Sequence, residues 1–533
     1  MKPFEIRVAG AHKRPIHFGS ASHPLFGFYH PPAEASWRGV GVVLCNPLGT
    51  DQTRSERTYR HLAERLSAAG FACLRFDLSG TGDSGGDERE PGLFRSWVED
   101  IGRAVEELRA CSGAEKIGLF GLRLGATLAM LHGAEHGDVD SLVLWGPCVS
   151  GPSFVREVTR LHKLYLRIEP QLANARPTPA DGEEALGGFL PRRLIEDLSQ
   201  VDLLKVERRP ARRTLLIDGG SFPERDSLMA RLRELEAAPQ LETHLGHKFL
   251  ITVSHRSLLP DEVIDSIVRW FTDAYPSLGV PPTREPPAPG LAPSGERPVV
   301  FGGSHPLFGI LTPADPARAR PGRPPIVLTN AGSVNRSGPH RTYVRMARRW
   351  AALGFDVFRM DLSGIGDSPV APGAQENIPY PPTGLADIEE AIRAVGAERV
   401  IIVGLCSGGD YAFQLGLREG VVGAWLLNPR TFCVLDLVAV ESADGAPPSA
   451  SVDAVPRRLR AIAERGVDTL LVVSKNDPGV AYVDAHAGDA MRAVSAVPRF
   501  RRVDLDGTDH TFTPVEAQER LSDVLTDHLT SRY

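Results

Sequence analysis

Two kinds of segment alternate along this chain: short apolar runs rich in β-branched residues, and longer segments with the apolar spacing of a helix. In the first half, buried strands are predicted at residues 39–44, 71–76, 116–120 and 141–145. Helices are predicted at residues 59–69 and 97–110, and from Leu124 onward. Strands that alternate with helices indicate right-handed crossovers and a mostly parallel sheet covered on both faces.

The second half repeats this pattern. Its predicted strands are residues 326–329, 355–359, 400–403 and 423–427, and its predicted helices are residues 343–352, 386–395 and a segment from about Ser407. The sequence recurs as well, with residues 22–27 repeated as 304–309, residues 75–84 as 359–368, and residues 121–125 as 404–408. A repeat of this length indicates a duplicated domain.

A proline-rich segment separates the two copies. Residues 276–298 contain eight prolines, which remove hydrogen-bond donors and favour extended backbone. We therefore predict a semi-rigid linker at 276–298 between domains at residues 1–275 and 299–533. The predicted fold class is α/β, with two tandem domains that each hold a mostly parallel sheet covered by helices.

Composition narrows the classes of partner. The 533 residues carry a net charge of −6 without a long basic run, which argues against binding to nucleic acid or to an anionic membrane surface. No apolar run is long enough for a membrane span, and Met1–Gly10 lacks the apolar segment of a signal peptide. Six cysteines without a CxxC pair favour a reducing cytoplasm over a disulfide framework.

The second copy contains a tight turn suited to a nucleophile. Gly404-Leu405-Cys406-Ser407-Gly408 follows the strand at 400–403 and precedes a helix, which is the strand–turn–helix pattern of a nucleophile elbow. Small residues must flank such a turn. The N-terminus of the helix that follows favours negative charge on the central residue of the turn. This frame places Cys406 at the nucleophile position. Ser407 is the rival, but its own frame would put Leu405 where a small residue belongs.

An acid and a base follow in the order that such an enzyme needs. Asp477 comes just after the predicted strand at 469–473, and His510 lies just before Pro514, which opens the last predicted helix. We expect His510 to deprotonate Cys406, and Asp477 to orient the imidazole and stabilise its protonated form. Asp509 is the alternative acid.

Two backbone amides are expected to form the oxyanion hole. One is the N–H of Ser407, directly after the nucleophile, and the other is the N–H of Ala331, after the predicted strand at 326–329. The recurring loop that contains Asp361 and Gly364 is interpreted as structural, because the first copy keeps the loop without a nucleophile.

The first copy lacks this chemistry. Arg123 occupies its elbow, and a guanidinium that stays protonated cannot attack a carbonyl. Phe222 aligns with Asp477, whereas His255 aligns with His510 but has no nucleophile to serve. Arg123 is either a salt-bridged arginine or a binder of carboxylate or phosphate.

The copies also differ in the segment where such folds carry a cap. The insertion between Pro147 and Leu204 is longer than its counterpart at residues 430–455. The second site is therefore either more open or covered by the first copy, in an intramolecular pseudo-dimer.

The two elbows carry a family resemblance. The whole chain resembles two fused α/β-hydrolase domains. Its Gly-Leu-Arg elbow at Gly121–Arg123 and its Gly-Leu-Cys elbow at Gly404–Cys406 are similar to those of the paired hydrolases associated with exosortase A systems. Cysteine elbows also occur in dienelactone hydrolases and polyhydroxyalkanoate synthases, so the resemblance implies a hydrolase fold without fixing a substrate.

The sequence favours an acyl-transfer enzyme that works through an acyl-Cys406 intermediate. It would act on an ester or thioester as a thioesterase, an esterase or an acyltransferase, because a thioester can be resolved by water, amines, alcohols or thiols. Delivery of the acyl group by a carrier protein stays open. No cofactor and no metal site are predicted. The alternative is a non-catalytic pair of hydrolase-like domains that binds a ligand or a partner.

Overall fold

A computed structural model describes residues 6–8, 11–176, 179–220, 222–244, 254–282, 284, 290–303, 305–430 and 454–533. The chain divides into two compact units, of which the first holds Met1–Leu161 with Pro179–Pro293, and the second holds His162–Thr178 with Ser294–Tyr533. Part of the expected linker, residues 283 and 285–289, lies outside the described residues. The predicted domain limits at 275 and 299 stay predictions.

The first unit is built on a nine-stranded sheet with the order β1-β2-β3-β5-β4-β6-β7-β10-β11. Its strands are β1 Ile6–Val8, β2 Ala11–Gly19, β3 Pro24–His30, β4 Val40–Cys45, β5 Ala72–Phe76, β6 Lys116–Leu122, β7 Ser141–Trp145, β10 Arg213–Asp218 and β11 Pro239–Thr243. The pairs from β5 to β11 are parallel, and β1, β2 and β3 add antiparallel strands at one edge.

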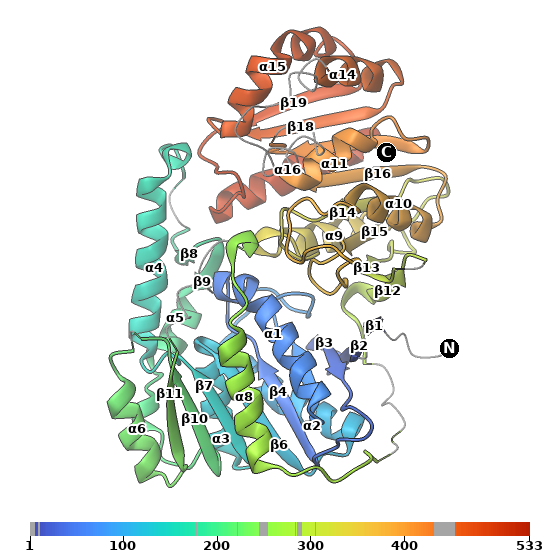
Figure 1. The fold of residues 1–533 in the computed structure, drawn as a ribbon. Coiled ribbons are helices and arrows are strands. Elements are labelled where there is room, and N and C mark those ends of the chain that lie inside the picture. The colour runs from blue at the N-terminus through green and yellow to red at the C-terminus, as the bar shows by residue number, and fades with distance from the viewer. Residues whose placement is uncertain are drawn as a thin grey trace. The chain divides into compact units, whose positions relative to one another are not determined.

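Helices cover both faces of this sheet (Figure 1). The described helices of the first unit are α1 Thr50–Ala68, α2 Leu93–Ser112, α3 Leu124–His136, α5 Arg192–Ser199, α6 Arg225–Glu234, α8 Asp261–Ala274 and the part of α4 Gly151–Ile168 that precedes His162. Apolar side chains of α1 and α8 pack on one face, and those of α2 and α3 pack on the other. The long insertion folds into α4, the hairpin of β8 Gly182–Ala185 and β9 Gly188–Pro191, and α5.

The second unit repeats this sheet with eight strands in the order β12-β13-β15-β14-β16-β17-β18-β19. These strands are β12 Arg297–Phe301, β13 Leu307–Thr312, β14 Ile326–Thr329, β15 Val357–Asp361, β16 Val400–Leu405, β17 Val421–Leu427, β18 Asp468–Ser474 and β19 Phe500–Leu505. The order equals that of the first sheet without β1. The predicted fold class, two tandem and mostly parallel α/β domains, is therefore confirmed.

The helices of the second unit again form two layers. They are α9 Thr342–Ala352, α10 Gly384–Val395, α11 Ser407–Leu415, α14 Ala454–Glu464, α15 Pro478–Val494 and α16 Val515–Arg532. Apolar side chains of α9 and α16 pack on one face, whereas α10, α11, α14 and α15 contribute to the core on the other. Most of the short counterpart of the insertion, residues 431–453, lies outside the described residues.

The central strands lie close to their predicted positions, but helix α1 begins earlier than predicted. Helix α1 begins at Thr50, whereas apolar spacing predicted its start at residue 59. Its first turns are polar, and their side chains bind neighbours instead of packing: Gln52 donates to Asp77 over 2.8 Å, and Asp51 pairs with Arg123. No apolar periodicity marks such turns. Among the described residues, no helix is long and apolar enough to cross a membrane.

Candidate functional site

Cys406 occupies the sharp turn between β16 and α11. Its backbone angles, φ 59° and ψ −120°, lie in a region that residues with a side chain rarely adopt. The flanking glycines are required by space, because a Cβ atom on Gly404 would overlap the carbonyl group of Gly408, and one on Gly408 would lie 2.6 Å from Thr329 Oγ1. The turn therefore has the crowding and the strained backbone of a nucleophile elbow.

The two candidate nucleophiles differ in exposure. Ser407 is fully buried, and its hydroxyl accepts a hydrogen bond from the Gly332 amide over 3.0 Å. Cys406 is only half-buried, and its side chain hydrogen-bonds His510. This arrangement supports the frame that assigns the nucleophile position to Cys406.

The structure brings His510 and Asp477 together. Asp477 is buried at the N-cap of α15, where Oδ1 accepts from the Gly479 amide, and Oδ2 lies 2.8 Å from His510 Nδ1. Burial lowers the pKa of His510, but its hydrogen bonds and charge interactions with Asp477 and Cys406 outweigh burial and raise the pKa from 6.5 to about 10. The imidazole therefore holds a proton readily between these two partners.

The alternative acid, Asp509, is engaged elsewhere. Its carboxylate accepts hydrogen bonds from the Thr513 amide over 2.6 Å and from the Thr513 hydroxyl over 2.5 Å. It also accepts from the hydroxyl of Tyr165 over 2.6 Å, in the segment His162–Thr178 of the second unit. Asp509 shapes the loop that carries His510, while Asp477 contacts the ring itself.

Sequence reasoning missed the residues that fix this loop. Asn428, directly after β17, donates from Nδ2 to the His510 carbonyl over 2.8 Å and to the Ser474 hydroxyl over 2.9 Å. Ser474, at the end of β18, donates to the Asp509 carbonyl over 2.7 Å. Asn428 has φ 42°, and an asparagine between a buried strand and a proline was the available signal, since asparagine tolerates this backbone region.

The two amides predicted for the oxyanion hole lie at the expected places in the fold. Ser407 is the first residue of α11, and Ala331 follows β14 and is buried. Within the described part of the chain, neither amide donates to a protein acceptor. Neither N–H group is therefore committed to an acceptor in the described protein, and their role in an oxyanion hole stays a prediction.

The recurring loop around Asp361 is held by internal hydrogen bonds. Asp361 accepts from the Arg336 side chain over 2.7 Å, from the Asn330 amide over 3.3 Å and from the Asp367 backbone over 3.0 Å. The first unit repeats this with Asp77, which accepts from Asn46 and from the Asp83 backbone. These contacts agree with the structural interpretation of the loop.

The first unit keeps the elbow and loses the reactive groups. Arg123 has φ 54° and ψ −125° and forms ion pairs with Asp51 and Glu157. Strand pairing aligns Cys45 with Thr329, so Pro47 stands where Ala331 stands in the second unit, and proline has no N–H to donate. At these two aligned positions the first unit therefore has neither a nucleophilic side chain nor a backbone N–H.

Among the described residues of the first unit, Phe222 and His255 do not form a triad with Arg123. Phe222 follows β10 and lines a cavity, at the sequence position that aligns with Asp477. His255 is exposed in a short 3-10 turn before α8. Across the described residues of both units, no group of three or more histidine, cysteine or acidic side chains is arranged to hold a metal ion.

Comparisons with known proteins agree with the fold. The serine aminopeptidase family S33, a hydrolase family, matches residues 53–206, which include the Arg123 elbow and not the Cys406 elbow. A comparison with curated protein sequences found no significant match. The order of the sheets, the two elbows and the family match together show an α/β-hydrolase-fold hydrolase.

Several solved structures are similar to half of the chain. Est1E from Butyrivibrio proteoclasticus, solved with ferulic acid bound, is 17% identical over 48% of this chain and 98% of its own, with a TM-score of 0.37. The Pyrococcus furiosus esterase Pf2001 is 15% identical over 50% of this chain and 93% of its own, with a TM-score of 0.35. Neither likeness is strong enough to transfer an activity.

Proposed function

We propose that the second unit is an acyl-transfer enzyme in which Cys406 is the nucleophile, His510 the base and Asp477 the residue that orients the base. One observation carries the proposal: Cys406, His510 and Asp477 form a hydrogen-bonded chain that begins at a strained elbow. A thiol in that position is activated by an adjacent base, which is oriented by a third group.

Before the first step the proton of the Cys406 thiol has passed to His510, whose raised pKa favours the imidazolium, and Sγ then attacks the carbonyl carbon of an ester or thioester. The carbonyl oxygen becomes an oxyanion, which the N–H groups of Ser407 and Ala331 stabilise. When the intermediate collapses, the bond to the leaving alcohol or thiol breaks, and His510 returns the proton to that group. The product of this step is an acyl thioester on Cys406.

In the second step an acceptor resolves the thioester. His510 removes a proton from water or from another acceptor, which attacks the acyl carbon, and the proton then returns to Cys406. Water gives hydrolysis, whereas an amine, alcohol or thiol gives transfer. A carrier protein is one source of the acyl group. The resemblance to exosortase-associated hydrolases, the cytoplasmic location and the pseudo-dimer stay predictions.

The test is detection of the covalent intermediate. Full-length protein would be mixed with acyl thioesters and matched oxygen esters of increasing chain length, and intact mass would be recorded over time. We expect an adduct of the acyl mass that is absent from Cys406→Ala and retained in Ser407→Ala. Cys433→Ala is a further control. Cys433 lies outside the described residues, so this variant tests whether the adduct forms on that thiol instead of Cys406.

Two outcomes would contradict the proposal. An adduct that survives Cys406→Ala and disappears in Ser407→Ala would move the nucleophile by one residue. No adduct and no turnover with any thioester or ester would favour the alternative, a non-catalytic pair of domains.

A further inference from the structure

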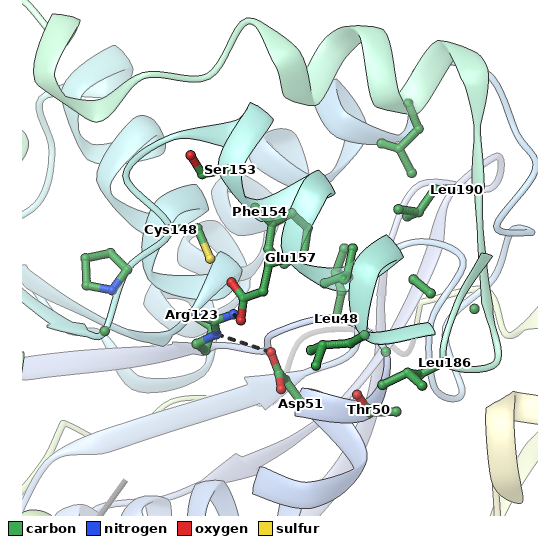
Figure 2. Close-up of a pocket in the computed structure, with 18 of the residues that line it drawn as sticks. Leu48, Thr50, Asp51, Arg123, Cys148, Ser153, Phe154, Glu157, Leu186 and Leu190 are labelled. Carbon is green, nitrogen blue, oxygen red and sulfur yellow. Dashed lines mark hydrogen bonds and ion pairs between the residues drawn. The ribbon is translucent and has the colours of Figure 1, made fainter. Parts of the chain in front are cut away.

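A cavity of about 510 Å³ lies within the first unit, beside its elbow. This volume is in the range of small-molecule sites. Figure 2 shows Arg123 joined to Asp51, with Ser153, Phe154 and Glu157 of α4 nearby. Apolar side chains from several elements dominate the walls, among them Leu48, Trp97, Phe154, Val158, Phe189, Leu190 and Phe222. The cavity thus has the form of a binding site in a unit that lacks a nucleophile.

The charge of Arg123 is already balanced. Its Nε lies 3.4 Å from Asp51 Oδ2, and one terminal nitrogen lies 2.5 Å from Glu157 Oε1 (Figure 2). Burial alone would lower the pKa of Arg123, but the negative groups around it raise the pKa above its usual range. With two carboxylates beside it, Arg123 offers little attraction to an anionic ligand.

Arg54 is in the opposite situation. It lies on α1 and lines the cavity, and its guanidinium has no hydrogen-bond or ion-pair partner among the described residues. Burial lowers the pKa of Arg54, and the nearby Asp51 only partly counteracts this effect. A partly buried cation without a partner is costly, and an anionic group on a ligand would remove that cost.

The other acidic side chains of the lining have their own interactions. Glu88 accepts a hydrogen bond from the Phe189 amide over 3.4 Å. Glu224 is at the N-cap of α6, where the helix dipole stabilises a negative charge. Asp51 and Glu157 are held by Arg123. Among the charged lining residues, Arg54 is therefore the group best placed to select the charge of a ligand.

We propose that this cavity binds a small amphipathic carboxylic acid, with the carboxylate on Arg54 and the hydrocarbon or aromatic body against the apolar walls. Guanidinium and carboxylate match in geometry and form paired hydrogen bonds. The bound acid undergoes no covalent step, because Arg123 and Pro47 replace the groups that acyl transfer needs. The first unit is then a receptor site, separate from the site proposed at Cys406.

The test measures binding to full-length Cys406→Ala protein by titration calorimetry. The probes are octanoate, decanoate and phenylpropanoate, each compared with the alcohol and the primary amine of the same body. We expect one acid per chain, bound ~10-fold or more tightly than its alcohol, the loss typical of a missing charged hydrogen bond. This comparison within one protein does not depend on any variant of Arg54.

Variants then locate the site. Arg54→Gln should remove the preference for the acid, Arg54→Lys should keep part of it, and Val158→Trp should weaken acid and alcohol alike by filling the cavity. Arg212→Gln is the matched control, because Arg212 is exposed and pairs with Asp140 outside the cavity. Tighter binding of the amine, or acid binding that Arg54→Gln and Val158→Trp both leave unchanged, would overturn the proposal.

Discussion

The two elbows of this chain have nearly the same backbone and opposite chemistry. Arg123 lies at φ 54° and ψ −125°, and Cys406 lies at φ 59° and ψ −120°. A tyrosine hydroxyl accepts a hydrogen bond from the amide just before each elbow, from Leu122 to Tyr59 over 3.1 Å and from Leu405 to Tyr343 over 2.9 Å. Strain at the elbow is therefore a property of the fold, and only the side chains around it separate a reactive site from an unreactive one.

The difference extends to the groups behind the elbow. Strand pairing aligns Trp145 with Leu427, so Gly146 in the first unit corresponds to Asn428 in the second. Both have positive φ, and both amides donate to the next strand, to Ile217 and to Val472 respectively. Only Asn428 adds a side chain that holds the His510 loop. The second unit thus uses a backbone position of the fold to support its candidate base.

The largest expected effect is the complete loss of acylation when the thiol is moved from the second elbow to the first. Cys406→Ala removes the thiol from the second elbow, and Arg123→Cys adds one to the same backbone position of the first. We expect this double variant to show no acyl adduct and no turnover. Among the described residues the new thiol would have no histidine–acid pair of the kind seen at Cys406, and Pro47 offers no oxyanion N–H. Intact mass with the acyl thioesters provides the measurement. A recovered adduct on the introduced thiol would show that the first unit retains hidden chemistry.

Removing the acid should change the pH dependence of acylation. The raised pKa of His510, about 10, means that its imidazolium persists until the pH passes through that value, so wild-type acylation should fall only near pH 10. Asp477→Asn removes one of the interactions that raise the pKa of His510. The decrease of the acylation rate at high pH should therefore begin at a lower pH than in wild type. The rate at neutral pH should drop roughly 100-fold, the lower range for a general base.

The same substitution carries a stability signature. A histidine with a raised folded-state pKa stabilises the protein fully below its unfolded value of 6.5 and loses that contribution as pH rises through about 10. Thermal unfolding of wild type and Asp477→Asn should therefore differ most at low pH and converge at high pH. If the acylation rate of Asp477→Asn had the same pH dependence as that of wild type, Asp477 would have no role in the protonation of His510.

The local sequence predicted the strands and the elbow better than the long-range hydrogen bonds that hold the candidate site in place. The central strands and the elbow at Cys406 were visible because apolar β-branched runs and closely spaced glycines leave a direct trace in sequence. Chain order placed Asp477 and His510 as partners, and the structure brings them within 2.8 Å. The hydrogen bonds of Asn428 with His510 and of Tyr165 with Asp509 were not predictable, since each joins residues far apart in the chain that only the tertiary fold brings together.

A smaller effect should follow from giving the second unit the residue of the first. Asn428→Gly keeps a residue suited to positive φ and removes the side-chain bonds to Ser474 and His510. We expect acylation of Cys406 to slow by ~10-fold, or about 1.4 kcal/mol, which is part of the combined worth of the three hydrogen bonds between the Asn428 side chain and Ser474 and His510. The matched control, Gly146→Asn, should leave acylation unchanged. Equal acylation rates for Asn428→Gly and wild type would show that the hydrogen bonds of Asn428 to Ser474 and His510 do not support catalysis.

The smallest expected effect concerns the tyrosines that both elbows share. Tyr59→Phe and Tyr343→Phe each leave a buried amide, of Leu122 or Leu405, without its acceptor. A loss of about 1 kcal/mol corresponds to ~5-fold faster exchange of that amide when local opening governs it. Hydrogen exchange resolved by peptide suits a two-unit chain, for which one global unfolding energy is not well defined. Each substitution should affect the elbow of its own unit, and Tyr343→Phe alone should also alter acylation of Cys406. If Tyr59→Phe slowed acylation as much as Tyr343→Phe, the two elbows would not act independently.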